Sequence, residues 1–551
     1  MKFLAARWLI LFCVSVGLLC VLFILQYTGY PYELRRLYIF DYLFRLEDLP
    51  GAAVVIFISV VAAVPALARP GLALVELIGR RPLATAAVTF LALCAGQLLV
   101  VKGHALAGDE HLILMQARAF AAGRLTAQFP TDLLTWVVPW PYANLWLYAS
   151  RDTGAVVSVY WPGFALLLAP FTLLGIAWAC NPLLAAGSLL LIGRLAARLT
   201  GAPQAAGWAM LLTIASPTFT GMALGYFSMV AHLFFNLVFV WLLLERTPRR
   251  LFLAGLVGSF ALVLNNPVPH ALVAAPWIAW IAWRDGRRAL FVLAAGYAPI
   301  GLIVGAGWWL LMRDVQGHLR FEPYARDDDL GNRFGNFLFY IQLQLNRVFA
   351  DPSLGSLAKR GAELVKLWLW AVPGLPALMV AGWWIARREI HLRLLGLSFA
   401  CTLAGYLVVW FDQGYGWGVR YLHPALAAAP ILGAAAIVAL QSESLRRYAA
   451  AAALLSLVVA TPFRGWQIES FMSDHLSRRP PFEKGARQAV FVTLSFPYYT
   501  QDFIQNDPFL RDPVIFLLSR GRAADEALLR ERFPGARLSH VAPYGHVWRL
   551  D

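Results

Sequence analysis

The sequence predicts a polytopic α-helical membrane protein with about 13 transmembrane helices and a small extracytoplasmic α/β domain at the C-terminus. Hydrophobic residues make up 60% of the 551 residues and charged residues only 14%, whereas a soluble globular protein carries about 25% charged residues. The hydrophobic residues gather in runs close to the roughly 20 residues that a membrane-spanning helix needs. Short arginine clusters separate many of these runs, and such clusters mark the cytoplasmic ends of spans.

The first apolar run, 8–27, follows a short basic N-terminus that contains Lys2 and Arg7. This run is longer than the roughly 7–15 apolar residues of a signal peptide, and no clear small-residue cleavage motif follows it. We therefore expect an uncleaved first span with the N-terminus in the cytoplasm.

The later apolar runs can be oriented by the basic clusters between them. The runs are 51–69, 83–102, 161–179, 181–199, 205–223, 228–244, 251–267, 270–283, 289–311, 367–385, 393–411, 424–441 and 448–463. The clusters are Arg69/Arg80/Arg81, Arg194/Arg198, Arg246/Arg249/Arg250, Arg284/Arg287/Arg288, Arg387/Arg388 and Arg446/Arg447. All of them face the cytoplasm only if 161–179 does not cross the membrane. Its breaker sequence Trp161-Pro162-Gly163 favours an interfacial or re-entrant segment.

With this topology, the long polar segments lie on the outer face and the inner loops are short. The outer segments are about 28–50, 103–180, 312–366, 412–423 and 464–551. We expect a membrane module at 1–463, with its first outer loop at 103–180 and a second large outer loop at 312–366. The chemistry should therefore lie on the outer face, because the inner loops are too short to hold a site.

The last outer segment, 464–551, has a different composition from the rest of the chain. Strand-like runs at 489–494, 514–518, 538–541 and 546–550 surround a helix-like run at 523–533. This pattern predicts a periplasmic α/β cap, with the C-terminus outside the cytoplasm.

Net charge and cysteine usage exclude several classes of function. The net charge is +15, but the basic residues lie between apolar runs, so they orient spans and do not indicate a nucleic-acid partner. The five cysteines lie in or beside apolar runs without paired spacing, which predicts neither a disulfide framework nor a zinc site. Heavy use of Arg and Ala with little Lys is typical of a GC-rich bacterial genome. We therefore expect a multi-pass protein of the bacterial inner membrane.

An acidic pair, Asp109 and Glu110, follows the third apolar run at the start of a stretch that resembles an amphipathic helix ending near Gly123. Acidic residues beside hydrocarbon are unfavourable, so a pair at the membrane surface indicates a candidate functional site. Asp109 could serve as a general base toward an attacking hydroxyl. The structural alternative is that Asp109 is the N-cap of the helix and Glu110 favours the helix dipole.

Several short motifs occur in the order in which one known family has them. They are Gly108-Asp109-Glu110 before a helix that ends Ala122-Gly123-Arg124-Leu125, Tyr160-Trp161-Pro162-Gly163, the basic turn Arg194 to Gly201, Ser216-Pro217 with Ser228 to His232, and Arg420-Tyr421 before Pro424. Over about residues 80–440 this order resembles the GT-C membrane glycosyltransferases. The nearest members are the protein O-mannosyltransferases and the lipid A aminoarabinose transferases.

The resemblance implies a GT-C-like fold and a glycosyltransferase that uses a polyprenyl-phosphate sugar as donor. It implies Asp109 as the catalytic base and Glu110 as a residue that orients the site. Two features depart from the family. The spans 8–27 and 51–69 precede the span that should be the family's first, and His232 lies near the place where aminoarabinose transferases carry an acidic residue, which weakens any transfer of their substrate.

The chemistry of such a donor leads to the same kinds of residue. A sugar phosphodiester already has a leaving group, so transfer needs cations at the phosphate and a base for the incoming hydroxyl. A single displacement inverts the anomeric carbon, and the acceptor hydroxyl could belong to a protein, a lipid or a glycan. Arg420 is the best candidate cation, with Arg333 and Arg347 as further candidates. An arginine that only reaches lipid headgroups is the structural alternative for Arg420.

Aromatic and histidine side chains complete the predicted pocket for the sugar or the acceptor. Its members are His111, Tyr160, His232, Tyr415, Trp417 and Tyr421. The glycines at 414, 416 and 418 allow close backbone approach in the segment that ends at Arg420. The histidines lack a ligand spacing, and a lone His is more often packed or hydrogen-bonded, so no cofactor is certain, and a divalent metal stays open although no pattern indicates one.

Two other classes of function compete with this interpretation. A transporter or lipid flippase would need polar groups at mid-span, often on broken helices, and Asn265-Asn266-Pro267 lies late in one run. A non-catalytic scaffold would bind a cell-wall polymer through its cap. Because the polar residues are concentrated in outer loops, we favour the enzyme, whose partners would be the lipid-linked donor, membrane lipids and an unidentified hydroxyl acceptor.

Overall fold

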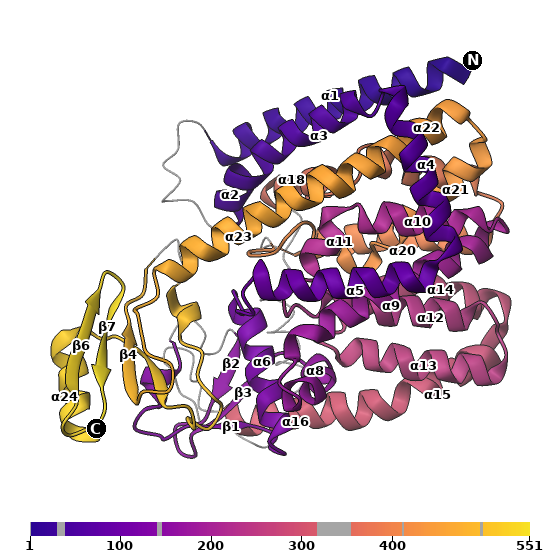
Figure 1. Ribbon diagram of the computed structural model, residues 1–551. Coiled ribbons are helices and arrows are strands. Elements are labelled where there is room, and N and C mark those ends of the chain that lie inside the picture. Colours follow the sequence, from indigo (N-terminus) through magenta and orange to yellow (C-terminus); the bar gives the residue numbers. More distant parts are fainter. Residues whose placement is uncertain (1, 30–38, 140–145, 317–353, 410–412, 496–499) are drawn as a thin grey trace.

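Long helices lie side by side over most of the computed structural model, and a small sheet next to the C-terminus lies at one end of them (Figure 1). The structure describes residues 2–29, 39–139, 146–316, 354–409, 413–495 and 500–551. The predicted phosphate-binding residues Arg333 and Arg347 lie outside the described residues, as does most of the predicted second large outer loop.

The helices of the first half of the chain are α1 (Lys2–Thr28), α2 (Ile39–Leu43), α3 (Leu49–Val61), α4 (Pro65–Arg80), α5 (Pro82–Leu99), α6 (Gly108–Ala121), α7 (Leu134–Val137), α8 (Gly163–Leu173), α9 (Cys180–Thr200), α10 (Gln204–Ile214), α11 (Pro217–Met222), α12 (Met229–Leu243) and α13 (Pro248–Val263). Those of the second half are α14 (Val268–Arg284), α15 (Gly286–Ile300), α16 (Gly307–Gln316), α18 (Leu354–Leu369), α19 (Leu375–Ile385), α20 (Ile390–Tyr406), α21 (Ala428–Leu440), α22 (Glu443–Leu455), α23 (Thr461–Ser477) and α24 (Arg522–Arg532).

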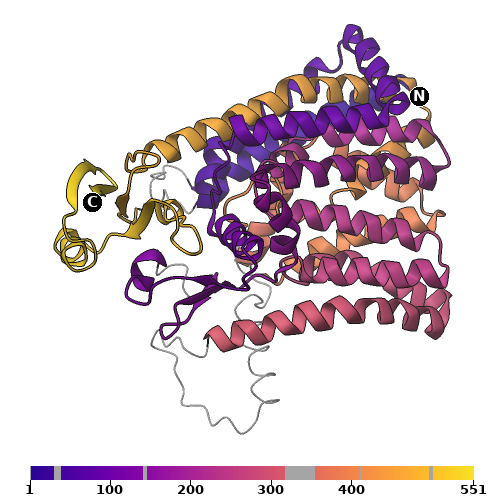
Figure 2. The ribbon, with the colours of Figure 1, turned by 60° about the horizontal axis from the view of Figure 1, so that its bottom comes forward.

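Within the described residues, six helical segments are long and apolar enough to cross a membrane, or up to seven if the bent pair Ile39–Val61 and Pro65–Arg80 is one span. Several further apolar helices, such as α12 and α20, are shorter. The predicted multi-pass helical architecture is therefore present, and the count of about 13 spans stays a prediction. The two termini lie at opposite ends of the helices in both views (Figures 1 and 2), and their placement relative to a membrane stays a prediction.

The segment predicted not to cross the membrane contains only a short helix. Helix α8 has 11 residues, which at about 1.5 Å per residue reach roughly 16 Å, well short of the roughly 30 Å hydrocarbon core. A short 3-10 turn (Ala177–Ala179) then leads into α9. Because α10 and α19, which lie in predicted spans, also have 11 residues each, the interfacial or re-entrant interpretation of 161–179 stays a prediction.

Small residues allow the long helices to approach closely. A Cβ on Gly255 of α13 would collide with the Leu293 carbonyl oxygen of α15, and one on Gly382 of α19 would collide with the Leu432 carbonyl oxygen of α21. Because lipid tails are as apolar as Leu, contact between backbones at small residues is a main source of attraction between membrane helices.

Two small sheets lie at the end of the helices that holds the C-terminus (Figure 2). The first has the order β1-β3-β2 and is antiparallel, with strands β1 (Ala127–Gln128), β2 (Leu147–Ala149) and β3 (Ala155–Ser158). The second has the order β5-β4-β7-β6, with strands β4 (Gln488–Val492), β5 (Val514–Leu518), β6 (Arg537–Ala542) and β7 (Gly545–Arg549). Only its β4–β5 pair is parallel. Strands β4–β7 and helix α24 overlap the runs that the sequence indicates.

The second sheet shares a hydrophobic core with the first outer loop. Phe491 of β4 and Leu517 of β5 pack in one buried cluster with Phe129, Trp136 and Met115. The predicted boundary at 463/464 falls inside α23, which continues α22 as part of one helical stretch from Glu443 to Ser477. The division into a membrane module and a separate cap therefore stays a prediction.

Candidate active site

Asp109 lies in the first turn of α6, and both of its carboxylate oxygens have partners. The N-cap of this helix is Ala107, so the capping role that the sequence leaves open for Asp109 is not what the structure shows. The Tyr160 hydroxyl donates to Oδ1 at 2.6 Å, and Nη2 of Arg420 forms an ion pair with Oδ2. The structure thus brings together Asp109, Tyr160 and Arg420, which the sequence singles out in three distant segments.

The segment before Arg420 is held in shape by its own hydrogen bonds. The Arg420 amide donates to Gln413 Oε1 at 2.9 Å, and Gln413 Nε2 donates to the Gly418 carbonyl at 2.8 Å. Gly414, Gly416 and Gly418 have φ values of +60°, +148° and +82°. Residues other than glycine rarely adopt backbone conformations with positive φ. The glycines therefore permit the turn that aims Arg420 at Asp109.

The Arg420 guanidinium is almost buried, with 10% of its side chain exposed. Its Nη1 donates to the Gln413 carbonyl at 3.1 Å, and its Cζ lies 4.4 Å from the centre of the Phe227 ring. Nε makes no hydrogen bond within the described part of the chain. A buried donor without a partner is unfavourable, so the guanidinium keeps one donor that a ligand could satisfy.

Burial and the charge of Asp109 both shift the pKa values of Arg420 and Tyr160. Burial alone would lower the pKa of Arg420, but the Asp109 carboxylate raises it above its ordinary value. Burial, and then Asp109, raise the pKa of Tyr160 well above its ordinary value. Arg420 therefore stays charged and Tyr160 stays a hydrogen-bond donor near neutral pH.

The Glu110 carboxylate accepts hydrogen bonds from the amides of two separate segments, one before α6 and one before α12. Its Oε2 accepts from the Leu106 amide at 3.1 Å, and its Oε1 accepts from the Tyr226 amide at 2.5 Å. Tyr226 lies just before α12, next to Phe227, whose ring contacts Arg420. The contacts support an orienting role for Glu110. Burial raises its pKa to about 7, against the opposing effect of the two amide donors.

The other predicted pocket residues lie at different distances from the ion pair. Tyr421 stacks on Tyr406, with ring centres 4.7 Å apart. Tyr415 and Trp417 are buried against Phe471 of α23. They contribute to the packing of the loop that precedes Arg420.

The two predicted pocket histidines do not contact Asp109, Tyr160 or Arg420 in the described residues. His111 is buried beside Phe129, Val138 and Ile504, where the first outer loop meets the C-terminal segment. Burial, with Arg118, lowers its pKa to about 3, so it is neutral. His232 is fully buried on α12. The described part of the chain contains no group of three or more His, Cys, Asp and Glu side chains placed to hold a metal.

Sequence reasoning missed Gln413, Phe227 and a second buried charge cluster around Asp48. Gln413 directly precedes the glycine-rich stretch, and this position is the sequence feature that could have marked it as a residue that shapes the loop. Asp48 and Lys366 lie at the ends of two predicted outer segments, but no local pattern indicates that they pair.

No known protein-family profile matches the chain, and no curated protein is significantly similar to it. The crystal structure of ArnT from Cupriavidus metallidurans bound to undecaprenyl phosphate does match, with a TM-score of 0.50 and 13% sequence identity. The match covers 84% of this chain and 97% of the ArnT chain. This chain has the ArnT fold. The crystal structure of the same ArnT in the apo state matches with a TM-score of 0.48, at 13% identity, over 85% of this chain and 97% of that one.

The likeness to ArnT concerns the fold, and it extends over most of this chain. Within the ArnT fold, Asp109, Tyr160 and Arg420 come from three segments that are far apart in the sequence. The roles of these residues follow from their contacts in this chain and remain predictions.

The raised pKa of Glu110 predicts a pH-dependent contribution to stability. Since this pKa rises from 4.5 to about 7 on folding, the contribution is fully present below pH 4.5 and is lost as the pH rises through 7. We expect the unfolding free energy of the wild type to fall, relative to that of Glu110→Gln, by up to about 3 kcal/mol between pH 5 and 8.

Thermal unfolding of the two proteins in detergent, followed across this pH range, measures the difference. Glu110→Gln is itself expected to be less stable at low pH, because one amide donor loses its acceptor. Parallel pH profiles for the two proteins would contradict the prediction.

Proposed function

We propose that the protein is an inverting glycosyltransferase that moves a sugar from a polyprenyl-phosphate donor to a hydroxyl acceptor on the periplasmic face of the bacterial inner membrane. The observation that carries the proposal is the contact of Asp109 with both Tyr160 and Arg420. The ArnT fold supports the class of reaction, and the undecaprenyl phosphate bound in one ArnT structure supports the lipid class of the donor.

The contacts suggest how the group could act on a sugar phosphodiester. The acceptor oxygen attacks the anomeric carbon while the bond from that carbon to the phosphate oxygen breaks, and the electron pair leaves with the phosphate. Asp109 Oδ2 takes the acceptor proton, and Arg420 stabilises the charge that builds on the phosphate. One displacement of this kind inverts the anomeric carbon.

The ion pair has a further consequence for this reaction. In the free protein, Arg420 occupies Oδ2 of Asp109, the oxygen that would act as the base. A donor phosphate competes with Asp109 for the guanidinium, so donor binding frees the carboxylate. Tyr160, which donates to Oδ1, holds the carboxylate in place meanwhile.

A transporter or lipid flippase is the alternative class, and one network inside the helices bears on it. His270 lies 2.7 Å from Asn236 Oδ1 through Nδ1 and 2.7 Å from the Tyr297 hydroxyl through Nε2. Asn236 Nδ2 donates to the Pro424 carbonyl at 3.1 Å. Both ring nitrogens of His270 are thus used between helices, which favours a packing role over a transport path.

Asp109→Asn should abolish sugar transfer, because the amide cannot accept the acceptor proton. We expect a loss in kcat of about 100- to 10,000-fold for the folded variant. Transfer from a synthetic polyprenyl-phosphate sugar, measured in proteoliposomes, tests this. Asp132→Asn is the matched control, since Asp132 lies in the same outer loop with 53% of its side chain exposed. Transfer by Asp109→Asn at the control rate would refute the assigned base.

Arg420→Ala should mainly weaken the use of the donor, because a charge-assisted contact to the phosphate is lost. We expect kcat/KM for the donor to fall by about 10- to 100-fold. Donor titrations in the same proteoliposomes measure the change, with the exposed Arg124→Ala as control. A donor response equal to that of the control would remove Arg420 from the site.

The proposed face can be tested by cysteine labelling in spheroplasts. A membrane-impermeant maleimide should label Arg124→Cys, which replaces an exposed residue of the first outer loop. It should label Arg287→Cys only after permeabilisation, because Arg287 lies in a predicted cytoplasmic cluster. The opposite pattern would place the Asp109 site on the cytoplasmic side and would end the proposal.

A further inference from the structure

A second buried polar cluster lies around Asp48, at the junction of the N-terminal helices with α18 and α23. The Asp48 carboxylate, which is fully buried, accepts from Lys366 Nζ and from Trp370 Nε1, both at 2.5 Å. Nη2 of Arg464 lies 3.2 Å from Asp48. Arg464 also covers the face of the Trp370 ring at 4.2 Å. Trp370 is therefore fixed by a carboxylate and two cations.

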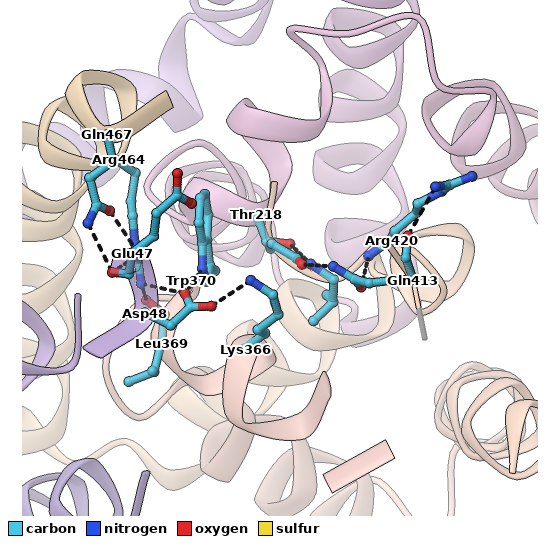
Figure 3. Close-up of polar contacts among 12 residues, drawn as sticks. Glu47, Asp48, Thr218, Lys366, Leu369, Trp370, Gln413, Arg420, Arg464 and Gln467 are labelled. Carbon is cyan, nitrogen blue, oxygen red and sulfur yellow. Dashed lines mark hydrogen bonds and ion pairs between the residues drawn. The ribbon is translucent and has the colours of Figure 1, made fainter. Parts of the chain in front are cut away.

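Trp370 connects this cluster to the loop that carries Arg420. The Trp370 carbonyl accepts from the Thr218 amide at 2.9 Å, at the start of α11. The Thr218 hydroxyl in turn accepts from the amide of Val419 at 3.1 Å, one residue before Arg420. Figure 3 shows Thr218 between the Asp48 cluster and the loop formed by Gln413 and Arg420.

Packing at the next turn of the same face of α11 makes the same connection. A Cβ on Gly221 would lie 3.1 Å from Trp417 and 3.4 Å from Trp370, so both tryptophans pack against α11 there. Gly418 has φ +82°, and a Cβ at that position would collide with the Thr218 hydroxyl. The loop therefore rests directly on α11, without room between them.

We propose that Thr218 is a positioning residue for Arg420, and that the Asp48 cluster fixes Thr218 through Trp370. The hydroxyl of Thr218 holds the Val419 amide, so it sets where the Arg420 guanidinium meets the phosphate of a lipid-linked donor. This inference rests on the proposed function. It adds Thr218 and Trp370, neither of which contacts Asp109 in the described part of the chain.

The variant Thr218→Val tests the proposal, because it keeps the shape of the side chain and removes the acceptor for the Val419 amide. We expect KM for the donor to rise about tenfold, with KM for the acceptor unchanged, since a buried amide that loses its acceptor costs the free energy of a hydrogen bond. Thr218→Ser is the matched control, because it retains the hydroxyl and should keep the donor KM of the wild type.

Trp370→Phe tests the link to Asp48, because it removes the indole donor and keeps the main-chain carbonyl that Thr218 uses. We expect a smaller rise in donor KM, about threefold, in the same direction. An unchanged donor KM in this variant would overturn the part assigned to Asp48. A wild-type donor KM in Thr218→Val, or equal effects of Thr218→Val and Thr218→Ser, would overturn the part assigned to Thr218.

A binding measurement separates this inference from the proposed function. Undecaprenyl phosphate should raise the unfolding temperature of the wild type and of Thr218→Ser, and should raise that of Thr218→Val clearly less. If the wild type binds this lipid but transfers no sugar, the proposed reaction fails, and the comparison of the Thr218 variants still decides the inference. Equal stabilisation of all three proteins would overturn it.

Discussion

The pairing of Asp109 with Arg420 is the contact around which the end of the helices near the C-terminal sheet is organised. The two residues are 311 positions apart, and both side chains are mostly buried. An isolated charge in such surroundings is strongly unfavourable, so each needs the other or a ligand that replaces it. Helix α6, the turn at Tyr160 and the loop that ends at Arg420 must therefore meet at one point, and this is where we propose the site.

The same requirement explains a second buried junction at Asp48. Its carboxylate pairs with both Lys366 and Arg464 where the N-terminal helices meet α18 and α23. Buried pairs contribute little net stability, because desolvation offsets their attraction, but they disfavour alternative arrangements that would separate the charges. Short helix α11 lies between the two junctions, with Thr218 in contact with both segments. The charge pairs of Asp48 thus constrain the position of the backbone at Val419, next to Arg420.

The predicted first outer loop and the C-terminal sheet share a hydrophobic core, which packs against helix α6. Met115 of α6 packs with Phe491 and Leu517 of the sheet, and the Gln128 amide donates to the Pro508 carbonyl at 2.8 Å. Local patterns predict both pieces, since alternating apolar residues indicate strands and an acidic start indicates a helix. No local pattern indicates that the two pieces bury one another, because burial depends on surfaces that are distant in sequence.

The sequence by itself determined the membrane-embedded helical class, the resemblance to GT-C enzymes, and the three residues Asp109, Tyr160 and Arg420. These follow from composition, hydropathy and motif order, which are properties of neighbouring residues. Only the tertiary structure decided that Arg420 pairs with Asp109, that Glu110 binds loop amides and that Asp48 holds Trp370. The physical reason is that a buried polar group takes whichever partner the packed helices bring within hydrogen-bond distance, and sequence separation places no limit on that choice.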